Sequence, residues 1–115
     1  MKYMMFVVAD PDAAAAAEPS PDDLTIEQWL AEVDDKRVTG DALRPVSEAV
    51  TVRVSRGEVL VTDGPFADTK EWIAGFDILE CDDLDEAIAI AARHPQANGG
   101  RLELRPFWTD DAPSG

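Results

Sequence analysis

Valine alternates with mostly polar residues on both sides of a short turn in VTVRVSRGEVLVTD, residues 50–63. It occupies positions 50, 52 and 54 before an Arg-Gly pair, and positions 59 and 61 after it. A period of two places alternate side chains on one face of a β-strand. A two-residue turn that ends in glycine joins antiparallel strands. The segment therefore predicts a β-hairpin, and any fold for this chain must include antiparallel strands.

Three other segments have the patterning of strands: residues 2–9, 75–80 and 101–108. The first is a continuous apolar run, which is typical of a central strand covered on both faces. The last places Glu103 and Arg105 on the face opposite Leu102 and Leu104. GDALRP, residues 40–45, has little periodicity, and we predict a short extended piece there.

Two segments have the periodicity of amphipathic helices. The first is predicted over residues 21–37, with Ser20 as its N-cap and Gly40 closing it. The second begins after Asp83, which forms a capping-box-like pair with Glu86. The apolar stripes expected to face the core are Ile26, Trp29, Leu30 and Val33 in the first helix, and Leu84, Ala87, Ile88 and Ala91 in the second.

The link between the first strand and the first helix, residues 10–20, is rich in alanine and proline. Its run of alanines favours a helix but is too short to be stable alone, and Pro19 and Pro21 interrupt any longer helix. We therefore predict a mobile loop over residues 10–20. The chain as a whole is predicted to be one domain over residues 1–109 with a tail at 110–115.

The expected order of elements is strand, helix, hairpin, strand, helix, strand. This is the split β-α-β arrangement of a ferredoxin-like α+β sandwich, to which the hairpin is an addition. Both helices then cover one face of the sheet and leave the other face bare. Because a second copy would bury the bare face, we expect a homodimer formed through the sheet faces.

The 115 residues include 24 acidic and 10 basic side chains, a net charge of −14. This charge repels nucleic acids and anionic membranes, so neither is an expected partner. The apolar start of the chain is short and runs into Asp10, which indicates a strand, and no segment approaches the length of a membrane span. The single cysteine, Cys81, forms no intramolecular disulfide, and we expect it to be buried and the protein to be cytoplasmic.

The stretch that leads from the hairpin to the second helix carries a family resemblance. LVTDGPFADTKEWIAGF, followed by DDLDEA, resembles the branch of the YCII-related family that is named for its DGPF motif. Four further pieces agree and lie in the family's order: KYMMFVV, GDALRP, Pro95 with Gly99 or Gly100, and LELRP. The resemblance covers nearly the whole chain and implies a dimeric α+β barrel of ferredoxin-like subunits.

The resemblance also implies relatives that include isomerases and dehydrochlorinases acting on ring compounds, together with many members of no assigned activity. YCII-type members have a His on the first helix and an Asp after the second, which form an acid–base pair. This chain has no His in its first helix, and His94 stands where those members have the Asp. The resemblance therefore implies the family's fold for this chain without that pair.

Asp63, at the start of the Asp-Gly-Pro turn, is the candidate for general acid–base catalysis. It is expected to end a strand beside a cleft, where an apolar environment raises the pKa of a carboxyl group. The alternative is structural, because an Asp side chain accepts backbone N–H bonds in a turn and Gly64 supplies permissive dihedral angles. In that alternative Phe66 anchors the corner in the core.

The candidates for ligand binding are Asp41, Arg44, Phe66, Lys70, Trp72 and Arg105. Arg44 follows the first helix and is expected to approach the same cleft, where it would clamp a substrate carboxylate. It is equally suited to pair with a surface acid. Lys70 and Trp72 are expected at the mouth of the cleft, or else as a solvated charge beside a packing aromatic ring.

His94 is the only side chain with an unperturbed pKa near neutrality, which makes it a second catalytic candidate. With Arg93 it falls in the last turn of the predicted second helix, beside Pro95, where a capping role is the alternative. One His without partners at ligand spacing forms no metal site, and no phosphate-binding loop is present. We expect no metal and no cofactor.

Two classes of function agree with these patterns. One is a dimeric binding or accessory module that takes a small-molecule ligand, with a regulatory protein as a further candidate partner. The other is a cofactor-independent lyase or isomerase that acts on a small ring compound and uses Asp63 as its acid–base residue. A buried Asp63 facing an open pocket with Arg44 would favour the enzyme.

Overall fold

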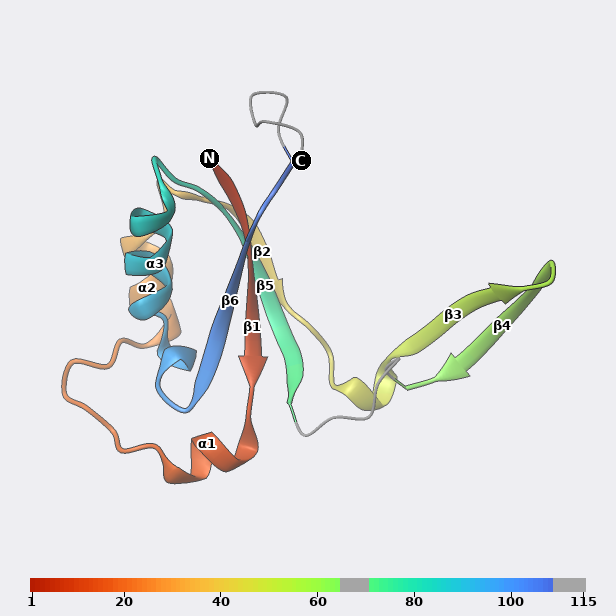
Figure 1. Cartoon of the computed structure of the whole chain (residues 1–115). Coiled ribbons are helices and arrows are strands. Elements are labelled where there is room, and N and C mark those ends of the chain that lie inside the picture. Colours follow the sequence, from red (N-terminus) through yellow and green to blue (C-terminus); the bar gives the residue numbers. More distant parts are fainter. Residues whose placement is uncertain (65–70, 109–115) are drawn as a thin grey trace.

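Four strands form one antiparallel sheet in the computed structural model, which describes residues 1–64 and 71–108. The strands are β1 (Lys2–Ala9), β2 (Arg37–Ala42), β5 (Trp72–Glu80) and β6 (Gly100–Pro106), and their order is β2-β5-β1-β6. Helices α2 (Ile26–Glu32) and α3 (Leu84–Ala92) lie on the same side of this sheet (Figure 1). The order and the antiparallel pairing are those of a ferredoxin-like fold, so the predicted α+β class is confirmed.

The predicted hairpin is confirmed as a separate two-stranded sheet. Strands β3 (Val50–Ser55) and β4 (Glu58–Asp63) pair in register from Val50 opposite Asp63 to Ser55 opposite Glu58. Arg56 and Gly57 have φ angles of 51° and 81°, and positive values at both positions are what a type I′ turn requires. A single 3₁₀ turn, η1 (Val46–Glu48), links β2 to the hairpin.

The core lies between the sheet and the two helices. Its largest fully buried side chains are Trp29 of α2, Tyr3 and Met5 of β1, and Leu79 of β5. The indole Nε1–H of Trp29 donates to the carbonyl oxygen of Ile90 in α3 at 3.0 Å, so one side chain ties both helices together. Cys81 is buried in the same core, as predicted.

The first long helix is shorter than predicted. Residues 21–24 are not helical, because Thr25 caps the helix instead of Ser20 and forms a capping box with Gln28. Ser20 makes a separate turn in which its backbone N–H donates to Asp23. Gly40 does not close the helix, since it lies inside β2, where the chain has already returned to the sheet.

The prediction of a loop over residues 10–20 is wrong for its first half, which is helix α1 (Pro11–Ala16). Asp10 caps this helix by accepting the N–H groups of Asp12 and Ala13, and Pro11 suits its first turn. The helix does not stand alone, because the turn at Gly99 approaches Ala14 so closely that a Cβ at Gly99 would lie 3.2 Å from it.

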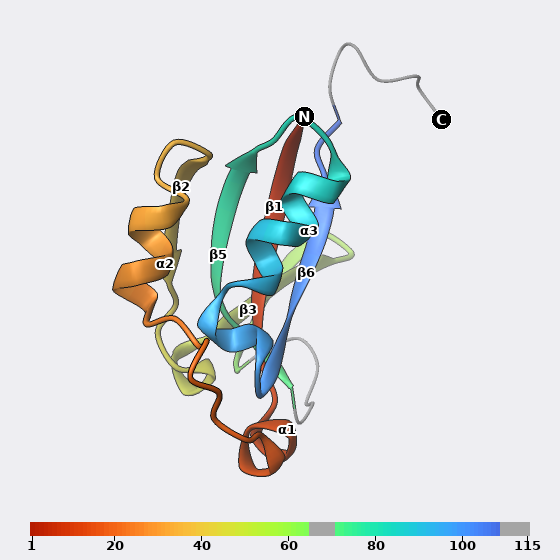
Figure 2. The same cartoon turned by 90° about the vertical axis from the view of Figure 1, so that its left-hand side faces the viewer.

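The buried face of α3 also differs from the predicted stripe. Ala87 and Ala91 are buried, but Leu84 and Ile88 are about half exposed, and Ile90 packs on the core instead. The two alanines let the helix lie close to the sheet. Figure 2 shows α3 over β1 and β6, and α2 over the side of the sheet that carries β2. Within the described part of the chain, no helix is both long and apolar enough to cross a membrane.

Candidate functional site

A cavity of about 330 Å³ lies between α2 and the β2–β5 side of the sheet. Its lining is mostly apolar, with Val7, Ile26, Leu30, Ala42, Ala74, Gly75 and Phe76. The polar residues that line it are Arg37, Asp41, Asp77 and His94. Apolar walls with a few placed polar groups are typical of small-molecule sites, and this volume is at the lower end of their range.

An ion pair between Arg37 and Asp77 forms one wall of the cavity. Arg37 begins β2, Asp77 lies in the middle of β5, and the Arg37 Nε–H donates to an Asp77 carboxylate oxygen at 2.6 Å. Asp77 is only 5% exposed. Burial raises the pKa of its carboxyl group, while the Arg37 guanidinium acts in the opposite direction.

Gly40 provides the space that this ion pair occupies. It lies opposite Asp77 in the β2–β5 ladder. A Cβ at this position would collide with the Asp77 carboxylate and would lie 2.7 Å from an Nη atom of Arg37. The glycine of GDALRP is therefore required by packing against the site.

His94 is held as a neutral imidazole. Its Nδ1 accepts the backbone N–H of Gln96 at 2.9 Å, so the proton of the neutral ring is on Nε2. The ring is 8% exposed and meets the Trp29 ring edge-on, with centroids 4.6 Å apart. Burial lowers the pKa of His94 to about 4. His94 lies after the end of α3, and its side chain caps the next turn, η2 (Pro95–Ala97).

The pH dependence of stability should report on His94. Its folded pKa of about 4 lies below the unfolded value near 6.5, so the unfolded chain binds more protons between these values. The contribution of the neutral ring is present above pH 6.5 and is lost as the pH falls toward 4. We expect wild type to lose about 2 kcal/mol from this source between pH 7 and pH 5.

Urea unfolding at the two pH values measures this loss, with His94→Asn as the control. Asparagine keeps an acceptor for the Gln96 N–H but does not titrate. The raised pKa of Asp77 acts in the opposite direction, but wild type and variant share it, so their difference isolates His94. An equal pH dependence in both proteins would contradict a neutral buried His94.

The structure separates the residues that the sequence proposed for one site. Asp41 and His94 line the cavity, whereas Asp63 ends β4 as predicted but is exposed and lies outside the cavity. Arg44 is exposed and pairs with Glu48 through bonds of 2.9 and 3.0 Å. Phe66 and Lys70 lie outside the described residues.

The two remaining candidates belong to the sheet. Trp72 begins β5 opposite Ala9 and is half-buried, and Arg105 is exposed on β6 opposite Met4. Neither lines the cavity. Arg105 lies with Glu103 on the side of the sheet away from the helices, since Leu102 and Leu104 pack on the core.

Sequence reasoning missed Arg37 and Asp77. The one local signal was Asp77 itself, a charged residue in the otherwise apolar strand segment AGFDIL. A charge is rarely buried without a partner, so a buried Asp in this strand requires a nearby cation. Which cation it was depended on the β2–β5 pairing, which brings together residues 40 positions apart.

Comparison with known proteins places the chain in a family. It matches the YCII-related domain over residues 1–109. An uncharacterised protein of Rhizobium meliloti (strain 1021) is 36% identical over an alignment of 115 positions. The alignment covers 93% of this chain and 92% of that protein. This chain also resembles a solved structure, that of 5-chloro-2-hydroxyhydroquinone dehydrochlorinase from Burkholderia phenoliruptrix AC1100 in complex with 2,5-dihydroxybenzoquinone. That structure is 15% identical, with a TM-score of 0.48 and 94% of each chain covered. By its match over residues 1–109, this chain belongs to the YCII-related family.

Proposed function

We propose that this protein binds a small molecule in the cavity between α2 and the β2–β5 side of the sheet. The observation that carries the proposal is the presence of the Arg37–Asp77 pair and the neutral His94 in the lining of one largely apolar cavity. Arg37 uses its Nε–H on Asp77, which leaves the ends of the guanidinium as donors. The Nε2–H of His94 is a second donor.

The chemistry of the lining favours a small ring compound that carries oxygen atoms. The apolar walls, which include Ile26 and Leu30 of the α2 segment, suit the faces of a ring. The donors of Arg37 and His94 suit hydroxyl, keto or carboxylate oxygens, and Asp77 accepts a bond from a hydroxyl group. A volume of about 330 Å³ limits the ligand to about one ring with its substituents.

A second candidate function is acid–base catalysis on such a ring, and Asp77 favours it. Its carboxyl group has a raised pKa and shares the cavity with a neutral histidine, a combination suited to proton transfer in a lyase or isomerase. In this proposal Asp77 takes the role that the sequence suggested for Asp63. His94 acts as a hydrogen-bond donor that polarises an oxygen of the ligand.

We also propose that the protein is a homodimer formed through the sheet faces. The side of the sheet away from the helices carries Met4, Phe6, Val8, Phe76 and Ile78, all partly exposed in one copy. These side chains lie between the buried residues of the same strands and so point to the opposite face. A second copy placed on this face would cover them.

Ligand binding is tested by a thermal-shift and calorimetric screen of hydroxylated benzenes and small aromatic acids. We expect a compound that raises Tm in wild type to lose at least about tenfold in affinity in Asp77→Asn, because a charged acceptor is lost. The matched control is Asp63→Asn, which removes a carboxylate outside the cavity and should leave the affinity unchanged.

Two results would contradict the proposed site. Loss of binding in Asp63→Asn but not in Asp77→Asn would move the ligand to the hairpin. An absence of binding across the whole panel, in a protein with its native Tm, would favour an accessory module with a regulatory protein as its partner.

A further inference from the structure

The hairpin has one face made of valine side chains that nothing in its own chain covers. In the β3–β4 register Val52 lies opposite Val61, and Val54 lies opposite Val59. With Val50 these side chains share one face, and each is between 58% and 66% exposed. Contiguous apolar patches of this kind on a monomer usually mark an interaction surface.

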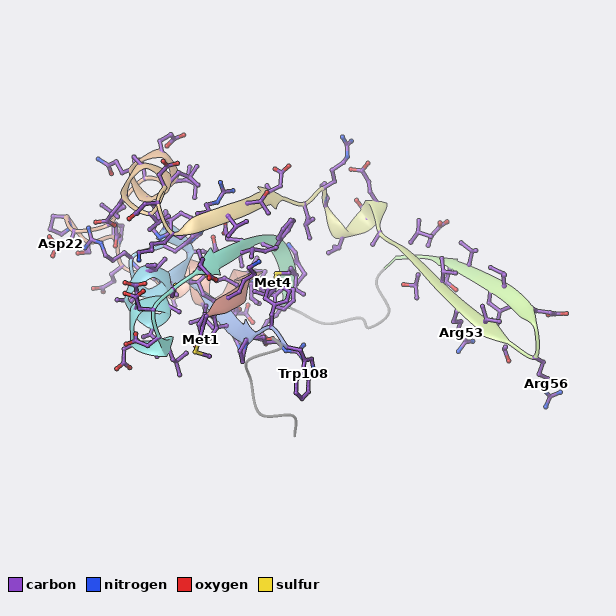
Figure 3. The ribbon with its side chains drawn as sticks, turned by 90° about the horizontal axis from the view of Figure 1, so that it is seen from above. Met1, Met4, Asp22, Arg53, Arg56 and Trp108 are labelled. Carbon is purple, nitrogen blue, oxygen red and sulfur yellow. The ribbon has the colours of Figure 1, made fainter. Side chains whose placement is uncertain are left out.

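The hairpin stands away from the rest of the chain. Figures 1 and 3 both show it extending from the side of the four-stranded sheet that is opposite the helices, and Figure 3 shows Arg56 at its outer end. An isolated two-stranded hairpin is only marginally stable in water. A regular hairpin with an apolar face therefore needs a surface to lie against.

The total exposed area is large enough to accommodate such a surface. The chain exposes 8397 Å², whereas a compact monomer of its mass exposes roughly 6,200 Å². The excess of roughly 2,200 Å² per chain is roughly 4,400 Å² for two copies, which is in the range that an obligate homodimer buries in total. A small ligand in the cavity would cover little of it.

Charge makes the hairpin the segment best suited to approach a second acidic copy. Arg53 and Arg56 balance Glu58 and Asp63, so residues 50–63 are neutral and the rest of the chain carries the whole net charge of −14. Two such bodies repel each other at most of their surface. A neutral arm with an apolar face makes contact without adding to that repulsion.

We propose that hairpin β3–β4 is an exchanged arm, and that in a homodimer its valine face packs against the second copy. The bare sheet face lies on the side from which the arm projects, so a copy seated there stands next to the arm. Twofold symmetry then gives each copy one arm and one surface that receives an arm. The proposal does not depend on the ligand site.

The first test compares adjacent residues on opposite faces of the arm. Val54→Lys and Ser55→Lys add the same charge at neighbouring positions, but only the first enters the valine face. We expect Val54→Lys to raise the dimer dissociation constant by at least about tenfold, while Ser55→Lys leaves it within about twofold of wild type. Sedimentation velocity over a concentration series measures both.

The second test measures how accessible each face of the arm is within the dimer. Cys81 is only 3% exposed, so Val54→Cys and Ser55→Cys each introduce the one accessible thiol among the described residues. At concentrations where the chain sediments as a dimer, maleimide should label position 54 at least about tenfold more slowly than position 55. Dilution below the dissociation constant should remove the difference.

Equal labelling of the two thiols within a stable dimer would overturn the arm and leave a dimer through the sheet faces intact. A chain that stays monomeric at high concentration would overturn both. Slow labelling of position 54 in a monomer would place the valine face on a surface of its own chain and would also overturn the proposal.

Discussion

Replacing Trp29 with alanine should lower the free energy of unfolding by about 3–5 kcal/mol, the largest effect expected of any single substitution described for this protein. Trp29 is fully buried between the sheet and the helices. Its removal leaves a cavity and also leaves the carbonyl oxygen of Ile90 without its donor. The edge-on contact with the His94 ring is lost as well.

The matched control is Trp108→Ala, since Trp108 is 75% exposed and its truncation creates no cavity in the core. We expect Trp108→Ala to change stability by less than about 0.5 kcal/mol. Urea unfolding followed by far-ultraviolet circular dichroism measures both variants without relying on tryptophan emission. Similar losses in the two variants would show that Trp29 does not hold the helices to the sheet.

The strand pattern of this fold is readable from local sequence, whereas the helix boundaries are not. Alternating valines and a turn ending in Gly57 leave few alternatives for residues 50–63. The predicted N-cap of the first helix was Ser20. Local signals favoured Ser20 with Pro21, but the capping box of Thr25 with Gln28 prevailed. That box was visible in the sequence as a Thr followed three positions later by a Gln.

Helix α1 and the buried face of α3 required tertiary information. Five alanines have helix propensity, but so short a helix needs a surface to pack on. The turn at Gly99, which is 85 positions from Ala14 in the sequence, packs closely against α1. In α3 the period of apolar residues was correct, but both Ala87 and Ile88 fit a stripe. Burial of the smaller residue follows from how closely the helix lies on the sheet, which no local pattern encodes.

The candidate site was only half predictable for the same reason. Asp41 and His94 were proposed from the local sequence, and both line the cavity. Asp63 was chosen because it follows a strand in a turn motif, and it does end β4. That strand belongs to the projecting hairpin and not to the sheet that forms the cavity, and only the pairing of strands distinguishes these cases.

Gly40→Ala is the substitution expected to disturb the site most directly, at a cost of about 3 kcal/mol in stability. An alanine Cβ would lie 2.5 Å from the carbonyl oxygen of Phe76 and would also collide with the Asp77 carboxylate. The carbonyl of Phe76 belongs to β5, an inner strand of the sheet, so the ion pair must move or β2, an edge strand, must separate from β5. Urea unfolding measures the cost, and calorimetry with any ligand found for the cavity measures the loss of the site.

A double-mutant cycle separates the Asp77 contact from the other two contacts that Gly40 avoids. In an Asp77→Ala background the carboxylate is gone, and only the contacts with Phe76 and the now unpaired Arg37 oppose the new Cβ. We therefore expect Gly40→Ala to cost at least about 1 kcal/mol less there than in wild type, because interacting neighbours are not additive. An unchanged cost would mean that the contacts with Phe76 and Arg37 require glycine without the carboxylate. The close approach of β2 and β5 would then exclude a larger residue at position 40, whether or not the Arg37–Asp77 pair is present.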